Sequence, residues 1–153
     1  MTMPSNESPT TIGADVATPY VLTHQAEHIR WLTLNRPEQR NPLSSGMIEA
    51  LSIAIAEANV DPQVRVVVLA SRGPVFSAGH DLREMSPRAG ETDEERGARV
   101  RQILEDCARM MLAIVHSPKA VIASVQGTAT AAGCQLVSAC DLALASEDAH
   151  FCT

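Results

Sequence analysis

Residues 127–141 read GTATAAGCQLVSACD, and this stretch decides the fold of the chain. Apolar runs flank it on both sides, AVIASVQ before it and LALAS after it. The glycines and alanines at its start leave almost no side chain around a turn that leads into a short predicted helix. Such a backbone can approach a ligand closely and direct free N–H groups at it. The same pattern is also typical of a tight turn in which small residues only permit close packing, so both interpretations stay open.

A second small-residue turn, FSAGHDL at residues 76–82, follows a predicted buried strand and opens a short helix. Two such turns, each with a backbone N–H group, can converge on one carbonyl oxygen and form an oxyanion hole. A P-loop is excluded for residues 127–133, because no Lys-Ser or Lys-Thr pair follows.

Hydrophobic periodicity predicts strands that alternate with helices along the chain. The expected strands are residues 20–25, 28–34, 64–70, 120–125 and 142–145. The expected helices run from Ser44 or Ser45 to Asp61, from Asp93 to Pro118, and after Gly133. The apolar face of the second helix, Met110 and Met111 included, is assigned to the core. This alternation favours an α/β architecture with crossover helices.

Composition is that of a single globular domain: 153 residues, 45% hydrophobic and 20% charged. The net charge of −6 argues against nucleic acid as a partner, and no apolar run is long enough to span a bilayer. Lys119 is the one lysine among 12 basic residues, so an anionic ligand would be met by arginines or backbone donors. Residues 1–19, rich in Ser, Thr and Pro, are predicted to be a disordered tail.

The cysteines show no paired metal-ligand spacing, so no metal site is predicted and reduced, buried thiols are expected. They are Cys107, Cys134, Cys140 and Cys152.

From about residue 20 to residue 153 the chain resembles the crotonase (enoyl-CoA hydratase/isomerase) superfamily. The motifs that carry the resemblance are NRPE at 35–38, NPL at 41–43, GPVFSAGHDL at 73–82, and the opening stretch at 127–141. The resemblance implies an α/β superhelix of ββα units in residues 20–153, with the C-terminal part missing. It also implies an acyl-CoA thioester as ligand, with coenzyme A present only as part of the substrate and no separate cofactor. A homotrimer or hexamer is implied for the full-length protein.

The resemblance implies a role for particular residues. The thioester oxygen would be bound by the backbone N–H groups of His80 and Ala132, the latter at a position where most members have glycine. The substrate contacts it implies are Arg40, Asn41, Leu43, Ala78, Gly79, Asp81, Leu82, Arg83 and Ala131. Arg40 and Arg83 are the candidates for the CoA phosphates.

One expected catalytic position departs from the family pattern. Hydratases of the family carry a glutamate where this chain has Gln135, and an amide has no titratable proton for general base catalysis. A second glutamate is expected just past Thr153. Three functions therefore stay open: an acyl-CoA hydratase or isomerase, an acyl-CoA-binding pseudoenzyme, and an enzyme of another reaction such as decarboxylation or thioester hydrolysis.

Side-chain roles at the site also stay open at this level. The imidazole of His80 is either an acid–base group or merely tolerated beside a useful backbone N–H. Asp81 is either a titrating group or a helix cap, and Gln135 either orients water or fills the place of a carboxylate. With no presequence evident, the cytoplasm is expected for a bacterial protein and the mitochondrion for a eukaryotic one.

Overall fold

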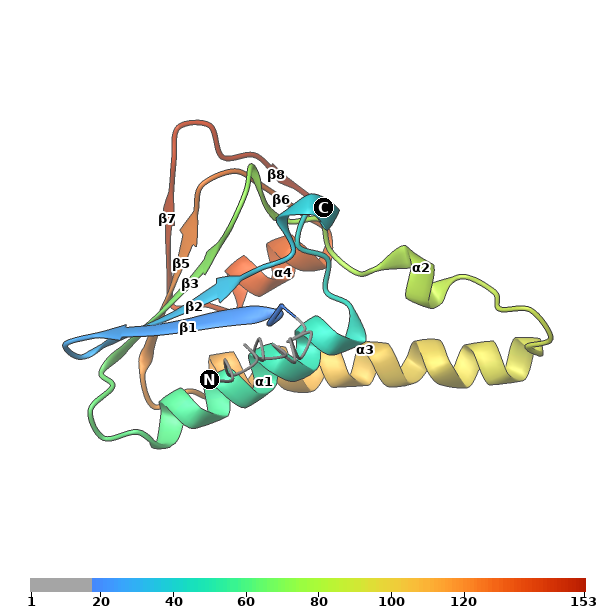
Figure 1. Cartoon of the computed structure of the whole chain (residues 1–153), viewed down its shortest axis with the longest axis horizontal. Helices are drawn as coiled ribbons and strands as arrows, with labels where there is room; N and C mark the ends of the chain where they lie inside the picture. Colours follow the sequence, from blue (N-terminus) through green and yellow to red (C-terminus); the bar gives the residue numbers. More distant parts are fainter. Residues whose placement is uncertain (1–17) are drawn as a thin grey trace, which may run out of the picture.

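The computed structural model describes residues 18–153 (Figure 1). The disordered tail predicted for residues 1–19 lies outside this range except for its last two residues. Five strands form the larger sheet, in the order β1-β2-β3-β5-β7. β1 and β2 are antiparallel, and the other neighbours are parallel. These strands are β1 (Val21–Ala26), β2 (Ile29–Leu34), β3 (Val66–Ser71), β5 (Ala120–Val125) and β7 (Leu142–Ala145).

A second, three-stranded parallel sheet has the order β4-β6-β8. Its strands are β4 (Val75–Ser77), β6 (Thr128–Thr130) and β8 (Phe151–Cys152). Each of them directly follows a strand of the larger sheet, so the chain passes from one sheet to the other three times. After β4 come the helices α2 (Leu82–Met85) and α3 (Asp93–Val115), and after β6 comes α4 (Ala132–Ser138). This repetition confirms the predicted superhelix of ββα units.

Local signals set the bounds of the two long helices. The Ser44 hydroxyl accepts a hydrogen bond from Met47 N and caps α1 (Ser45–Val60), which stops at Asp61. Thr92 and Glu95 form a capping box at the start of α3. A short 3₁₀ helix, η1 (Pro37–Gln39), lies in the polar loop before α1.

The core lies between the two sheets and the helices α1, α3 and α4. α1 packs against α3 and against β1 and β2, and α4 packs against β4 and β6 (Figure 1). Phe76 in β4 and Leu69 in β3 are among the fully buried side chains. None of the helices in the described range is long and apolar enough to cross a membrane.

The predicted strands of the larger sheet agree with the structure to within two residues, but all three strands of the second sheet were missed. The residues of β4 and β6 were expected in or next to the two small-residue turns, and no element was expected at β8. Each is two or three residues long, too short for a period-two pattern to show. Their strand character comes from pairing with residues far away in the sequence.

Candidate functional site

The two small-residue turns lie side by side. β4 and β6 pair through Val75 with Thr128 and through Ser77 with Ala129, so the turns that follow them leave the sheet together. Gly79 has a φ of +82°, and a Cβ placed on it would lie 3.1 Å from Thr130 O and 3.2 Å from Ala132 N. A side chain here would be strained by the positive φ and crowded by these atoms, so glycine suits this position, and the first turn lies against the start of α4.

Each turn offers a backbone donor. Leu43 N donates to Gly79 O (2.7 Å) and Asp81 N donates to Leu43 O (3.5 Å), which makes a parallel bridge between Leu43 and His80. His80 lies between the two residues that bond to Leu43, and in such a bridge it directs its own N–H group away from the strand of Leu43. Ala132 is the first residue of α4, so its N–H group has no acceptor within that helix. Within residues 18–153 neither N–H group donates to a backbone oxygen.

Ala131 gives the second turn its shape. Its φ of 48° and ψ of −121° lie in a region that L-residues rarely adopt. Ala131 N donates to Cys152 O in β8 (2.8 Å), and its carbonyl oxygen accepts from Cys134 N (2.9 Å) and Gln135 N (3.2 Å). The last strand and the first turn of α4 therefore hold the strained residue in place.

Two adjoining hollows open beside these turns. The first, which we name the turn hollow, has a volume of about 790 Å³. The second, named the α3 hollow, has a volume of about 410 Å³ and is lined by Gln135 and by one face of α3. His80 and Leu104 line both hollows. Among the predicted site residues, the turn hollow is lined by Arg40, Ala78, His80, Asp81, Leu82, Arg83 and Ala131.

The structure places Asn41 and Leu43, both predicted as substrate contacts, beneath the site rather than in it. Their side chains are fully buried. The Asn41 amide donates to Arg72 O (2.8 Å) and Val75 O (2.9 Å), and its Oδ1 accepts from Arg36 N (2.8 Å). These two residues hold the loop that carries Arg40, and Gly79 likewise supports the site through its backbone alone.

Asp81 is the N-cap residue of α2, which agrees with one of the two roles expected for it from the sequence. Its carboxylate accepts from Arg83 N (3.0 Å) at the start of α2. It also pairs with the Arg83 guanidinium through Nε (2.9 Å) and Nη2 (2.7 Å), and this hydrogen bonding lowers the pKa of Asp81. Most of the Arg83 side chain remains exposed (69%), and Arg40 is exposed beside it. Part of the Arg83 charge is thus balanced within the protein.

Among residues 18–153, one buried side-chain nitrogen or oxygen atom has no hydrogen-bond partner. This atom is Nδ1 of His80. Gln135 is exposed on α4 and lines the same α3 hollow. No cluster of metal-ligating side chains occurs in this part of the chain.

The four cysteines are all free. Cys107 and Cys134 are buried as expected, but Cys152 is exposed in β8. Burial raises the pKa of Cys107, and burial together with the Asp141 charge raises that of Cys140 to about 12. Both of these groups therefore remain thiols at neutral pH.

Most of the lining of the α3 hollow was not expected from the sequence. The sequence pattern placed Leu104 on the apolar face of α3 and Met111 in the core, whereas Leu104 is 46% exposed and Met111 is only partly buried. Leu104, Ala108, Met111 and Leu112 form a second apolar stripe beside the buried stripe of α3. The available signal was the apolar face of α3, which is wider than packing against a single neighbouring element requires.

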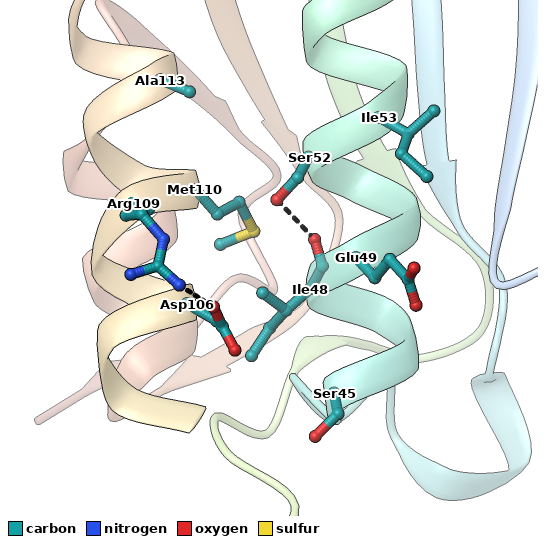
Figure 2. Close-up of a pocket in the computed structure, with 9 residues that line it drawn as sticks. All are labelled: Ser45, Ile48, Glu49, Ser52, Ile53, Asp106, Arg109, Met110 and Ala113. Atoms are coloured by element: carbon teal, nitrogen blue, oxygen red, sulfur yellow. Dashed lines mark hydrogen bonds and ion pairs between the residues drawn. The ribbon is translucent and has the colours of Figure 1, made fainter. Parts of the chain in front are cut away.

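A separate hollow of about 520 Å³ lies between α1 and α3 (Figure 2). In it Ser52 donates to Ile48 O (2.7 Å) and Arg109 pairs with Asp106, so these polar side chains are satisfied by close neighbours on their own helices. None of the predicted site residues lines this hollow.

A mixed five-stranded sheet and a parallel three-stranded sheet, joined by ββα units, lie together with paired small-residue turns beside a hollow. This arrangement defines the crotonase class of fold. The family profile described as Enoyl-CoA hydratase/isomerase matches residues 24–153, and the chain belongs to this family.

Individual relatives agree with this assignment. The chain is 43% identical over 132 residues to the zebrafish (Danio rerio) "Enoyl-CoA hydratase domain-containing protein 3, mitochondrial", covering 86% of this chain and 44% of the relative. The crystal structure of the human protein of that name superposes with a TM-score of 0.80 at 37% identity, covering 88% of this chain and 51% of that one. A Mycobacterium smegmatis enoyl-CoA hydratase structure gives 0.79 at 46% identity, with 88% and 50% covered. The chain spans about half the length of these relatives.

Proposed function

We propose that the chain binds an acyl-CoA thioester in the turn hollow and polarises it in a backbone oxyanion hole. The thioester oxygen would accept hydrogen bonds from His80 N and Ala132 N. The observation that carries this proposal is the contact between the two turns, where a Cβ on Gly79 would lie 3.2 Å from Ala132 N, next to two N–H groups without backbone acceptors. Family membership supplies the class of ligand.

The CoA moiety would lie along the turn hollow, with its phosphates near Arg40 and Arg83. Both side chains are exposed at the rim of this hollow, and guanidinium groups bind phosphate oxygens well. For the full-length protein we propose a homotrimer or hexamer. A mitochondrial location is proposed if the protein is eukaryotic, which the name of the zebrafish relative supports, and a cytoplasmic one if it is bacterial.

An oxyanion hole stabilises the enolate or tetrahedral species that forms when a thioester reacts, which is the electrostatic part of catalysis. The proposed activity is that of the hydratase/isomerase family in acyl-CoA metabolism. Gln135 favours a second candidate, an acyl-CoA-binding pseudoenzyme. Its exposed amide lines the α3 hollow but can only orient water and cannot take up a proton.

Calorimetric titration of the chain with acetyl-CoA and with free CoA tests binding. Saturable binding that is tighter for acetyl-CoA supports the oxyanion hole, because free CoA lacks the thioester oxygen. Equal affinity for both ligands, or no binding by a folded chain, contradicts it.

The variant Gln135→Glu, made in the full-length protein that also contains the second glutamate expected past Thr153, separates the two candidate functions. If the natural protein is a pseudoenzyme, crotonyl-CoA hydration is absent in the parent and appears in the variant, since a carboxylate can act as general base. Turnover of crotonyl-CoA by the parent contradicts the pseudoenzyme. Gln102→Glu on the exposed face of α3 is the matched control and should leave the parent's behaviour unchanged.

A further inference from the structure

Two segments of the chain form most of the lining of the turn hollow, residues 38–42 in the loop before α1 and residues 78–85, which include α2. Glu84 belongs to the second segment but does not itself line the hollow. Its Oε2 atom accepts hydrogen bonds from Ser45 N (2.7 Å) and from Ser45 Oγ (2.7 Å). Ser45 is the first residue of α1 and lies just after the first segment, so Glu84 joins the two segments from outside the hollow.

The position of Ser45 favours this contact. The N–H groups in the first turn of a helix have no acceptor within that helix, and this end of the helix carries partial positive charge. A carboxylate placed there makes charge-assisted hydrogen bonds, which are stronger than those between neutral groups. Because both donors of Ser45 meet one oxygen atom of Glu84, they fix the position of this side chain relative to α1.

The backbone of α2 is held from the other side by α3. The Arg99 guanidinium donates to Glu84 O and to Ser86 O (3.0 Å). α2 has only four residues, and a helix this short is not stable on its own, so its contacts with α1 and α3 determine where it lies. The side chains that α2 contributes to the turn hollow are Leu82, Arg83 and Met85.

We propose that Glu84 is a positioning residue of the acyl-CoA site, which holds α2 against α1 so that Arg83 and Arg40 can bind one CoA molecule together. This inference rests on the proposed function and adds to it a residue that does not touch the ligand. The Arg83 guanidinium also reaches the first segment, through a hydrogen bond to Gln39 Oε1 (3.2 Å). Without the Glu84 carboxylate, α2 loses its hydrogen bonds to α1, and the two segments can move apart.

Calorimetric titration of the variant Glu84→Ala with free CoA and with acetyl-CoA tests the proposal. Both ligands should bind about tenfold more weakly than they bind to the parent, as expected for the loss of a charged hydrogen-bonding group. The ratio of the two affinities should stay unchanged, because Glu84 acts on the CoA moiety and not on the thioester oxygen. Glu84→Gln keeps an oxygen that can accept from Ser45 and should stay within about threefold of the parent.

Glu95→Ala is the matched control. Glu95 Oε2 accepts from Thr92 N (2.8 Å) and from Thr92 Oγ1 (2.8 Å) at the start of α3. This is the same pair of hydrogen bonds as at Glu84, but Glu95 does not line the turn hollow and joins no second segment to it. Glu95→Ala should lower the melting temperature, followed by circular dichroism, about as much as Glu84→Ala does, and it should leave both affinities unchanged.

Three results would overturn the role of Glu84 while acyl-CoA binding stands. The first is parent-like affinity in Glu84→Ala, and the second is a loss in Glu84→Gln as large as that in Glu84→Ala. The third is an equal loss of affinity in Glu95→Ala, which would mean that destabilisation alone weakens binding. If the folded parent binds neither ligand, the proposed function fails as well.

Discussion

Ala131 occupies a backbone conformation that suits glycine better than alanine, with φ 48° and ψ −121°. Because glycine adopts positive φ without steric cost, Ala131→Gly should stabilise the chain by about 1 kcal/mol in urea unfolding, net of the added freedom of the unfolded chain. Ala98→Gly, at an exposed position inside α3, is the control and should destabilise it by about 1 kcal/mol. Equal losses in the two variants would show that Ala131 stores no strain.

Gly79 and Gly90 allow strain and crowding to be separated. Both have positive φ, but a Cβ on Gly79 would crowd Ala131, Thr130 and Ala132, while a Cβ on Gly90 would meet nothing within 4 Å. Gly90→Ala should therefore cost only about 1 kcal/mol of strain, and Gly79→Ala about 2 kcal/mol or more, with loss of acyl-CoA affinity. Urea unfolding and calorimetry measure the two effects. Equal destabilisation with unchanged affinity would argue against a close contact between the turns.

At the scale of elements, Arg99 on α3 holds the preceding loop. Its guanidinium donates to the Glu91 carboxylate (2.7 and 2.6 Å) and to the carbonyl oxygens of Glu84 and Ser86. The hydrogen bond from Arg99 is the main reason why the pKa of Glu91 falls from 4.5 to about 2. Since the folded-state pKa is the lower one, this stabilisation is complete above about pH 4.5 and is lost as the pH falls towards 2.

The melting temperature should therefore fall more steeply between pH 5 and pH 2.5 in the parent than in Glu91→Gln, as followed by circular dichroism. Glu105→Gln, at an exposed position on the same helix, should keep the parent's pH dependence. Parallel curves for the parent and Glu91→Gln would mean that the ion pair does not form in solution.

Sequence could predict the elements whose signals are local. The β-branched run of β3, the Ser44 cap and the acidic start of α3 each specify their element through neighbours in the chain. Sequence could not predict the second sheet, because its short strands are defined only by their pairing. β4 pairs with β6 about 50 residues further along the chain, and β8, among the last residues of the chain, pairs with β6. The family motif named His80 and Ala132 as one candidate site, and the strands that lead into their two turns do pair. It did not show that Asn41 and Leu43 are buried supports.

At the scale of the whole molecule, β7 is an exposed edge of the larger sheet. Leu142 and Leu144 on it are 63% and 68% exposed, and Phe151 on β8 is 52% exposed. Exposed apolar edge strands promote association between chains. Light scattering of the 153-residue chain should therefore show association that the double variant Leu142→Lys, Leu144→Lys reduces. Ile53→Lys, at an exposed helical position, should have a smaller effect, and an equal effect would indicate general surface hydrophobicity instead.

The oxyanion hole is best tested by nuclear magnetic resonance of the backbone amides of His80 and Ala132 in the isotopically labelled chain. Both amide protons should shift downfield when acetyl-CoA binds and should move much less with free CoA, because only the thioester oxygen can accept their hydrogen bonds. If both ligands bind and these two amides respond to them in the same way, the two turns bind CoA without forming an oxyanion hole.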